Sequence, residues 1–584
     1  MSDQDNAANV PTNAQRLAAG LRRHGITVVF GQSIPAALLL AAPEYGIRQI
    51  GYRTENAGGI MADGFARISG RITAVTAQNG PAATLLVAPM AEALKASVPM
   101  LVLVEEVPAS DVERNAFQEF DHVTLFRPVA KWIARIDHPQ RLDDLLDLAV
   151  VTATSGRPGP VVLLLPRDML VQRTAVSPYR QARLGEFPLD RQVPAPEAVS
   201  EAARLILEAK RPLVIAGGGV HLSGGAEALE RLCQNWALPV ATTNMGKGAI
   251  AETHPLALGV FGNCMGKGTT AAELRHYVTD ADLLLLIGTR TNQNGTDAWT
   301  LYPPEAKIIH IDIDGIEIGR NYESVRLLGD ARETLRILDA AMAAHEPDRG
   351  ALLARAEVIG AQTHDARRRA SVITAEWGAG TRGSIRPEAL MRVLDTRLRP
   401  DDIVTSDASY STNWMTSFLT ARRSGQRFVA PRGLAGLGWG VPLAMGAKLA
   451  APGSRVIALV GDGGFGHCWS EIETARRMNI DVKVIVLNNQ ILGYQKHGES
   501  AFFGAYSDAC DFTAVDHAAI ARACGLEAFT LEDPADLESA IDRLLASQGP
   551  TLMDMMTDDQ ALPPLNQFVG RNTVAPVRAW KPGR

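Results

Sequence analysis

Short apolar runs alternate with amphipathic helical stretches along almost the whole chain, and this alternation limits the fold more than any other feature. The runs are rich in Val, Ile and Leu, with clear examples at 27–30, 73–76, 100–104, 160–165, 212–216, 282–288, 307–313, 402–405, 455–460 and 482–487. Such runs, separated by helices, are typical of βαβ units, whose parallel sheets are buried on both faces. The sequence therefore predicts an α/β fold of doubly wound parallel sheets.

The chain is too long for a single core, because domains with one core rarely grow to 584 residues. Changes in composition separate three blocks, at about 12–180, 197–344 and 384–558, and a polar, Arg-rich helical stretch at 349–382 leads to the third. Residues 559–584 are rich in Pro, Arg and Asn and show little periodicity, which indicates an irregular flap or a disordered end. We predict three α/β domains followed by a C-terminal tail or lid.

Charge and apolar patterning exclude several classes of function. The formal net charge is −6 and no basic block stands out, which argues against a nucleic-acid partner. The longest apolar runs, such as 160–166, are too short to span a bilayer, and residues 2–15 lack the apolar core of a signal peptide. The cysteines are scattered without a CxxC pair, which fits a reducing compartment and no zinc site. We expect a cytoplasmic protein without a membrane partner.

The most informative motif is a Gly-rich turn after the predicted strand at 455–460. The turn consists of Gly461, Asp462, Gly463 and Gly464, and the next predicted strand is followed by Asn488, Asn489 and Gln490. Glycine has no Cβ, so backbone N–H groups in such a turn can approach a phosphate. The oxygens of Asp462, Asn489 and a backbone carbonyl near Ile491 would form, with two diphosphate oxygens, the near-octahedral shell that Mg²⁺ prefers. The alternative is a solvated turn followed by an unrelated Asn-Asn turn.

This pattern resembles the diphosphate motif of thiamine-diphosphate (ThDP) enzymes, and the resemblance covers roughly residues 12–558. Within that superfamily the chain resembles the large subunit of acetolactate synthase. The resemblance implies a pyrimidine-binding domain, a central nucleotide-binding-like domain and a diphosphate-binding domain, with ThDP and Mg²⁺ as cofactors. The implied diphosphate and metal residues are Gly461, Asp462, Gly463, Gly464, Asn489 and Ile491.

Glu55 is the candidate acid–base residue of the first block. It follows a short strand and opens a helix of small residues, where a carboxylate would be buried, have a raised pKa and share a proton. Glu55 resembles the glutamate of ThDP enzymes that hydrogen-bonds a pyrimidine nitrogen and favours the imino tautomer, although Thr54 replaces the usual histidine. The alternative is a glutamate that only complements the helix dipole.

Two further segments of the first block resemble parts of the family's active site. Asn79 lies in a turn, 78–84, that resembles the Ser-Gly-Pro-Gly turn beside the cofactor, with Ala82 in place of a glycine. Phe117 and Gln118 belong to a segment similar to the Phe-Gln-Glu-x-Asp loop of acetolactate synthase, whose Phe and Gln face the substrate from the neighbouring subunit. The resemblance therefore implies a homodimer or homotetramer with its active site at the subunit interface. The alternative is a surface loop with a helix cap.

In the third block, residues 431–440 resemble the family segment that contacts the pyrimidine, here with Ala435 near the ring and Leu437 as the wedge that bends the cofactor. The segment implied near the diphosphate contains Ser409, Tyr410 and Ser411. Tyr494 and Gly498 stand where acetolactate synthases carry Met and Trp, so the substrate remains open. Tyr at the first of these places resembles the oxalyl-CoA decarboxylase and 2-hydroxyacyl-CoA lyase branch. Candidate proton shuttles are His122, His467 and His497.

The middle block carries glycines and carboxylates at predicted strand ends, which suit a pyrophosphate and ribose hydroxyls. The candidate nucleotide-binding residues are Gly217, Gly218, Gly219, Arg290, Asp312 and Asp330. The resemblance implies FAD, as in acetolactate synthase, or ADP, as in related CoA enzymes. An empty Rossmann-like domain is the third alternative.

We therefore predict a ThDP- and Mg²⁺-dependent lyase or carboligase that cleaves or joins C–C bonds of 2-keto acids. One alternative is a lyase of CoA thioesters, of the 2-hydroxyacyl-CoA lyase or oxalyl-CoA decarboxylase type, in which the tail residues Arg571, Arg578 and Lys581 fold over the adenosine phosphates. The other is a non-catalytic regulatory homologue that binds ThDP or a nucleotide.

Overall fold

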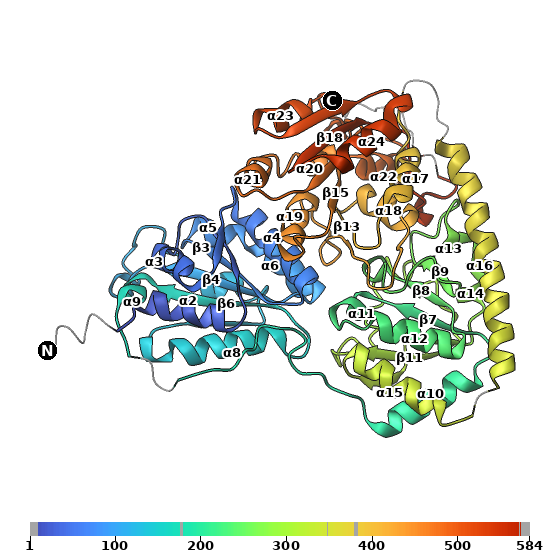
Figure 1. The fold of residues 1–584 in the computed structure, drawn as a ribbon, viewed down its shortest axis with the longest axis horizontal. Coiled ribbons are helices and arrows are strands. Elements are labelled where there is room, and N and C mark those ends of the chain that lie inside the picture. Colours follow the sequence, from blue (N-terminus) through green and yellow to red (C-terminus); the bar gives the residue numbers. More distant parts are fainter. Residues whose placement is uncertain (1–9, 176–178, 347, 379–383, 572, 574–584) are drawn as a thin grey trace, which may run out of the picture. The chain divides into compact units, whose positions relative to one another are not determined.

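Three parallel six-stranded sheets organise the protein, in a computed structural model that describes residues 10–175, 179–346, 348–378, 384–571 and 573. Each sheet has its own cluster of buried apolar side chains. Strands and flanking helices alternate along the chain (Figure 1). The prediction of an α/β protein with three doubly wound parallel sheets is confirmed. Within the described ranges, no helix combines the length and the apolar character that a bilayer span requires.

The first sheet has the strand order β2-β1-β3-β4-β6-β5. Its strands are β1 (Val28–Phe30), β2 (Arg48–Ile50), β3 (Thr73–Ala77), β4 (Met100–Glu106), β5 (Trp132–Arg135) and β6 (Pro160–Pro166). Its helices are α2 (Asn13–Arg23), α3 (Ala36–Ala41), α4 (Glu55–Ser69), α5 (Pro81–Leu85), α6 (Val87–Ala96), α7 (His122–Phe126), α8 (Leu142–Thr154) and α9 (Arg167–Val171). Every residue of the paired strands β4 and β6 is buried, which explains the continuous apolar runs at 100–104 and 160–166.

The second sheet has the order β12-β11-β10-β7-β8-β9, in which all strands are parallel and the strand order reverses between β7 and β10. Its strands are β7 (Pro212–Ala216), β8 (Val240–Thr242), β9 (Ala257–Val260), β10 (Leu283–Ile287), β11 (Lys307–Asp312) and β12 (Val325–Leu328). Its helices are α10 (Pro196–Glu208), α11 (Gly218–Leu222), α12 (Ala226–Trp236), α13 (Thr270–Glu273), α14 (His276–Thr279) and α15 (Ala331–Ala343), followed by the long connector α16 (Arg349–Gly378).

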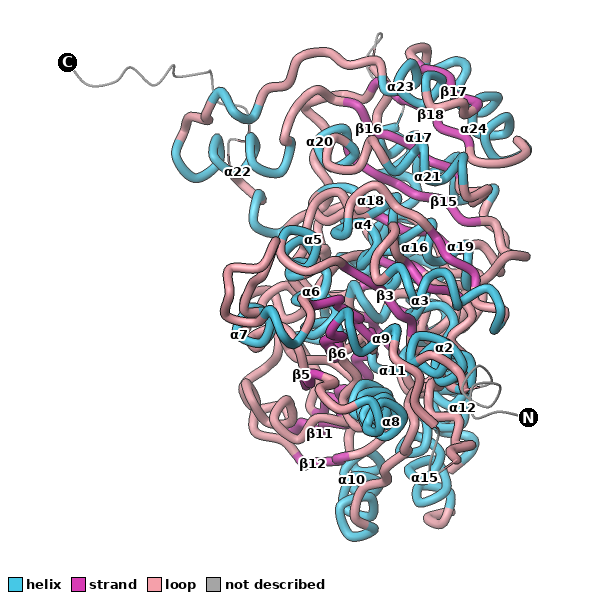
Figure 2. Tube along the Cα trace, turned by 90° about the vertical axis from the view of Figure 1, so that its left-hand side faces the viewer, coloured by secondary structure: helices cyan, strands magenta, loops and turns pink. Residues whose placement is uncertain are grey.

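The third sheet has the order β14-β13-β15-β16-β18-β17 and the same topology as the first. Its strands, magenta in Figure 2, are β13 (Ile403–Ser406), β14 (Phe428–Val429), β15 (Val456–Gly461), β16 (Lys483–Asn488), β17 (Glu527–Leu531) and β18 (Thr551–Met556). The helices of this part of the chain are α17 (Pro387–Arg397), α18 (Tyr410–Phe418), α19 (Gly440–Ala450), α20 (Asp462–Phe465), α21 (Glu471–Arg477), α22 (Gly493–Phe503), α23 (His517–Ala523) and α24 (Leu537–Ala546). All these strands are parallel, and the strand order reverses between β13 and β15, the position where such sheets bind ligands.

Contacts divide the described residues into two compact units. One comprises the described residues up to Asp190 with Pro431–Gly453 and Cys468–Val482, and the other comprises those of 191–430, Ser454–His467 and the described residues from Lys483 onward. In the first unit, α19 packs along α4, and a Cβ added at Gly64 would lie 2.5 Å from the Leu443 carbonyl oxygen. The small residues of α4 therefore allow two helix backbones to touch.

The first half of the tail packs against the second unit. Ala561, Leu565 and Phe568 are buried with the core of the third sheet, and Phe568 ends a short 3-10 helix, η7 (Asn566–Phe568). The Gly266 N–H donates to the Pro564 carbonyl at 3.1 Å. The predicted tail is thus irregular but docked over 559–571, whereas Arg578 and Lys581 lie outside the described residues.

Candidate active site

The start of α4 is held by a carboxylate that lies 418 positions further along the chain. Glu471, fully buried in the first turn of α21, accepts the backbone N–H groups of Arg53 at 3.1 Å and Thr54 at 3.0 Å. Burial raises the pKa of Glu471. Thr54 is the N-cap of α4 and Glu55 is its first residue, so Glu471 fixes the backbone next to the predicted acid–base residue. Glu55 itself is half-buried in the single chain, rather than buried as we expected.

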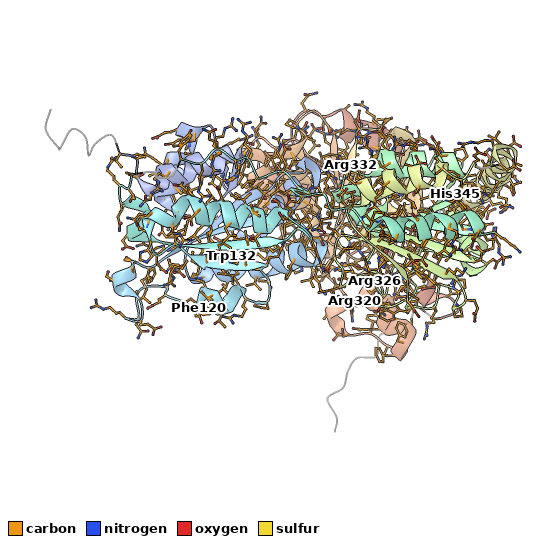
Figure 3. All side chains as sticks on the ribbon, turned by 90° about the horizontal axis from the view of Figure 1, so that it is seen from below. Phe120, Trp132, Arg320, Arg326, Arg332 and His345 are labelled. Atoms are coloured by element: carbon orange, nitrogen blue, oxygen red, sulfur yellow. The ribbon has the colours of Figure 1, made fainter. Side chains whose placement is uncertain are left out.

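The predicted residues Asn79, Phe117 and Gln118 lie together in the first unit. The Asn79 amide donates to the Phe117 carbonyl at 3.0 Å, and the Gln78 amide donates to the Gln118 side-chain oxygen at 2.7 Å. The Phe117 side chain is 83% exposed, and Phe120, labelled in Figure 3, is also exposed. Two exposed aromatic rings on a loop are unusual for a monomer's surface and are typical of a ligand or subunit contact.

A buried histidine stabilises this loop. The Nε2 atom of His122 accepts the Gly80 N–H at 2.9 Å, so Nδ1 carries the proton and donates to Glu106 at 3.0 Å. Glu106 is also paired with Arg135. Both nitrogens of His122 are therefore engaged inside the protein, which argues against the proton-shuttle hypothesis for this residue. His467, a second candidate, is exposed.

A second buried carboxylate holds the segment that resembles the pyrimidine-contacting loop. Glu92 accepts the backbone N–H groups of Gly433, at 2.7 Å, and of Leu434. Arg67 of α4 pairs with Glu92 and with Asp63, and all three side chains are buried. Burial raises the pKa of Asp63, while Arg67 opposes the rise. In the loop so held, Ala435 is exposed with φ +65° and Leu437 is half-buried.

The Gly-rich turn of the second unit joins the ends of β15 and β16. Asp462, the first residue of α20, accepts the Gly463 N–H at 2.9 Å and the Gln490 N–H at 2.7 Å. Asp462 thus lies directly beside Asn489 and Ile491, the other predicted metal ligands. Asn488 is turned away, because its amide donates to Asp554 at 3.1 Å.

The neighbouring strand end completes this part of the site. A Cβ added at Gly464 would lie 1.9 Å from the Asp407 Oδ2 atom, and one added at Gly461 would lie 3.8 Å from the Ser411 hydroxyl. Ser409 has φ +69°, a backbone conformation that residues other than glycine rarely adopt. The predicted diphosphate residues after β13 and β15 therefore meet at the reversal point of the third sheet.

The residues around Asp462 fit a divalent cation. The carboxylate is 6% exposed and, among the described residues, forms no ion pair with a cationic side chain. Burial raises its pKa from 3.8 to about 7 although the Gly463 and Gln490 N–H groups oppose the rise, so the protein alone only partly compensates the charged form. No cluster of three His, Cys, Asp or Glu side chains that could hold a metal occurs in the described ranges. A cation here would need the amide, backbone and diphosphate oxygens that the sequence predicts.

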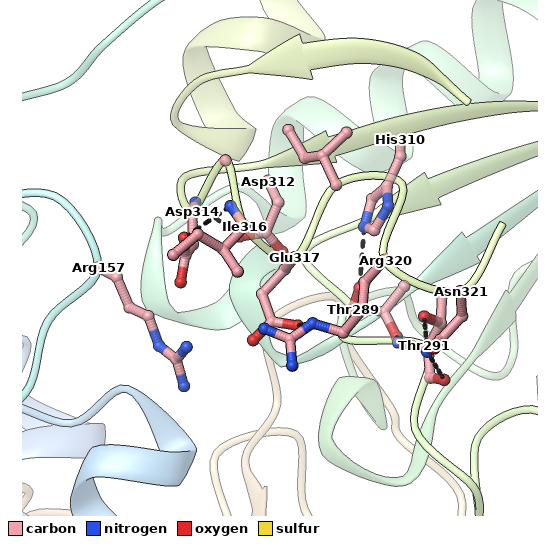
Figure 4. Close-up of polar contacts among 12 residues, drawn as sticks. Arg157, Thr289, Thr291, His310, Asp312, Asp314, Ile316, Glu317, Arg320 and Asn321 are labelled. Atoms are coloured by element: carbon pink, nitrogen blue, oxygen red, sulfur yellow. Dashed lines mark hydrogen bonds and ion pairs between the residues drawn. The ribbon is translucent and has the colours of Figure 1, made fainter. Parts of the chain in front are cut away.

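In the middle domain, the predicted nucleotide residues lie at or just after the carboxyl ends of β7, β10, β11 and β12. A Cβ added at Gly217 would lie 2.3 Å from the Gly288 carbonyl oxygen, so this glycine is required for packing of the chain itself. Asp312 is the last residue of β11, near Glu317 and Arg320 (Figure 4), and accepts the Asp314 N–H at 2.9 Å.

Two other predicted residues of this domain have different surroundings. Arg290 follows β10 and is half-buried. Asp330 is buried as the N-cap of α15, where it accepts the Glu333 N–H at 3.1 Å and pairs with Arg191 at 2.9 Å. Asp330 therefore has a structural role whether or not a nucleotide is bound.

Three buried carboxylates of the site, Glu92, Glu106 and Glu471, were not identified from the sequence. The available signal was weak, since each is a single charged residue near an apolar or small-residue stretch. Such residues are rarely fully buried unless they are paired or hydrogen-bonded.

Comparison with known families assigns each part of this site to a domain. Residues 11–125 match the "Thiamine pyrophosphate enzyme, N-terminal TPP binding domain", residues 199–338 the "central domain", and residues 407–555 the "C-terminal TPP binding domain" of the same enzymes. The fold and the site therefore define a ThDP-dependent enzyme.

Similar proteins narrow this class. The chain is 33% identical over 581 residues to a probable acetolactate synthase large subunit of Methanocaldococcus jannaschii, which covers 97% of this chain and 95% of that protein. It is 33% identical over 567 residues to the acetolactate synthase large subunit of Parasynechococcus marenigrum (94% and 88% covered). It is 28% identical over 551 residues to acetolactate synthase isozyme 2 large subunit of Escherichia coli (94% and 95% covered). The chain belongs to the acetolactate synthase-like family of ThDP enzymes, as the sequence motifs predicted.

Proposed function

We propose that the protein is a Mg²⁺-dependent carboligase or lyase that acts on 2-keto acids. The observation that carries the proposal is the buried carboxylate of Asp462, which lacks a cationic partner among the described residues and lies beside Asn489 at the ligand-binding end of the third sheet. The similar proteins are named acetolactate synthases, and the resemblance to that family implies a 2-keto acid substrate.

Asp462, Asn489 and the Ile491 carbonyl would hold Mg²⁺, and the glycines at 461, 463 and 464 would face the diphosphate. When bound, ThDP would supply the carbanion chemistry and the electron sink that making or breaking a C–C bond next to a carbonyl needs. Glu55 would hold a proton at the pyrimidine ring, on a backbone that Glu471 keeps in place. Phe117 and Gln118 would exclude water and orient the substrate. Each role follows from the family resemblance and the position of the residue.

The activity is tested with purified protein, ThDP and Mg²⁺ against a panel of 2-keto acids. Glu55→Gln should slow turnover by about 10-fold to 100-fold, on the scale of lost proton catalysis. Unchanged turnover in this variant would remove the assigned role of Glu55. Asp462→Ala should abolish Mg²⁺-dependent ThDP binding in calorimetry, and retained binding would remove the metal assignment.

We further propose that the active site is shared between two subunits of a cytoplasmic homodimer or homotetramer. In that arrangement, Glu55 of one chain serves the Asp462 site of another. Mixing slow Glu55→Gln chains with Asp462→Ala chains would then create sites in which both residues are intact. Random dimers would recover about a quarter of wild-type activity, because one site in half of the dimers is complete. A site built within one chain would recover none.

For the middle domain we propose a bound FAD or ADP, held near Gly218, Arg290 and Asp312 at the carboxyl ends of β7, β10 and β11. The purified protein should be yellow with FAD. A colourless protein that releases ADP on denaturation would select the second ligand, and release of neither would show an empty domain.

A lyase of CoA thioesters remains a second candidate, because the tail brings a cation to α22. The Arg571 guanidinium lies 4.4 Å from the centre of the Phe502 ring. This function would be favoured if the protein turned over acyl-CoA substrates but no 2-keto acid. Truncation after residue 570 should then abolish the turnover of acyl-CoA substrates.

A further inference from the structure

A buried histidine on α22 connects three segments that are far apart in the sequence. His497 is 2% exposed. Its Nδ1 atom lies 3.0 Å from the hydroxyl oxygen of Tyr410, the first residue of α18. Its Nε2 atom lies 3.0 Å from the carbonyl oxygen of Asp559, in the segment after β18.

These contacts determine which nitrogen of His497 carries the proton. A carbonyl oxygen only accepts hydrogen bonds, so Nε2 must be protonated and donate to Asp559. In the neutral ring Nδ1 is then an acceptor, and the Tyr410 hydroxyl donates to it. Burial lowers the pKa of His497 and raises that of Tyr410, which favours the neutral form of both groups. The direction of both hydrogen bonds is therefore defined.

The same cluster surrounds Tyr494, one turn earlier on α22. The Tyr410 ring lies edge-on to Tyr494, with ring centres 5.7 Å apart, and stacks on His497 at 5.8 Å. From the tail, the Gln567 amide donates to the Tyr494 hydroxyl at 2.9 Å, and Phe568 packs against its ring at 6.1 Å. The Tyr494 hydroxyl keeps its own proton for another acceptor, and the side chain is 39% exposed.

We propose that His497 is a positioning residue that joins the start of α18 to α22 and the docked tail, and thereby fixes Tyr494 toward the substrate. The consequence for turnover rests on the proposed function. Tyr410 lies beside Ser411 and the diphosphate-binding turn, while α22 begins directly after the predicted metal ligands. Loss of the two hydrogen bonds would free α22 and the tail from α18 without removing a ligand of Mg²⁺.

The proposal is tested with two substitutions that differ in hydrogen bonding. Glutamine can donate to the Asp559 carbonyl and accept from Tyr410, whereas leucine of similar size can do neither. His497→Leu should raise KM for the substrate at least about 10-fold and lower kcat, with ThDP affinity nearly unchanged. His497→Gln should restore both values to within about 3-fold. Gln495→Leu, an exposed change on the same helix, is the control.

The pH profile separates this role from a purely structural one. Protonated His497 would donate from both nitrogens, so the Tyr410 hydroxyl would have to reverse. The groups that face His497 are Tyr410, the neighbouring Lys496 and Asp559, and Tyr494 lies against Tyr410. We expect the KM of the wild type to rise as the pH is lowered, and the KM of His497→Gln to show no such rise. Identical profiles for the two proteins would contradict the proposal.

A measurement without turnover keeps this inference distinct from the proposed function. Hydrogen exchange of α22 and of residues 559–571 should accelerate at least about 10-fold in His497→Leu and stay at the wild-type rate in His497→Gln. If no substrate is turned over while this exchange pattern holds, the proposed function fails and the positioning role stands. If exchange in His497→Leu matches the wild type, the positioning role is wrong.

Discussion

The uncompensated charge of Asp462 leads to a test that needs no substrate. Burial raises the pKa of this carboxyl from 3.8 to about 7. The native metal-free protein therefore binds more protons here than the unfolded chain between about pH 4 and pH 7, and its stability falls as pH rises through that window. With those two pKa values, the stability lost at this site between pH 5 and pH 8 is about 2.5 kcal/mol.

Asp462→Asn removes this pH dependence while keeping the shape of the side chain. In the variant the NH₂ group of asparagine takes the place of one carboxylate oxygen that accepts a backbone N–H. The lost hydrogen bond should lower the free energy of unfolding by about 1–3 kcal/mol at every pH. Wild type should therefore be the more stable protein at pH 5. Between pH 5 and pH 8 the difference in free energy of unfolding should shift by about 2.5 kcal/mol in favour of the variant. For a cooperative unit of about 150–250 residues this corresponds to a shift of about 5–10 °C in the difference between the two unfolding temperatures.

The assay is thermal unfolding of chelator-treated wild type and variant at several pH values from 5 to 8. Asp401→Asn, at a carboxylate that is 81% exposed, is the control and should show no such shift. ThDP with Mg²⁺ should raise the unfolding temperature of wild type at pH 8, and that of the variant far less. A wild-type–variant difference that is the same at pH 5 and pH 8 would refute the argument from a buried charge.

Three further predictions concern packing, charge and metal. Gly464→Ala should destabilise the protein by about 1–3 kcal/mol and weaken ThDP binding, because its Cβ would overlap Asp407, whereas Gly453→Ala points into open space and should do neither. Arg67→Met should lower the free energy of unfolding in urea by about 3–5 kcal/mol by leaving two buried carboxylates uncompensated, while Arg71→Met at an exposed pair should change it by less than about 1 kcal/mol. Exhaustive chelation should abolish turnover and added Mg²⁺ should restore it, and full activity after chelation would contradict a metal requirement.

The central strands could be predicted from the sequence, and several edge strands could not. β3, β4, β15 and β16 lie in sheet interiors and are apolar on both faces, so each is visible as an apolar run. In contrast, β5, which runs from Trp132 to Arg135, is half-exposed along its length and carries no such run. It becomes a strand because β6 offers it a pairing partner.

The sequence by itself predicted the thiamine-diphosphate class and placed the candidate diphosphate residues in one turn. Asp462 and Asn489 follow neighbouring strands, and consecutive parallel strands bring such residues to one edge of a sheet. Only the tertiary structure decided how the site is held, through Glu471 at Arg53, Glu92 at Gly433, and His497 at Tyr410. These partners are separated by 418, 341 and 87 positions. A hydrogen bond between distant residues depends on the packing of whole helices and strands, so it leaves no periodic signal in the sequence. A turn after a buried strand, in contrast, is recognised from its own glycines and carboxylates.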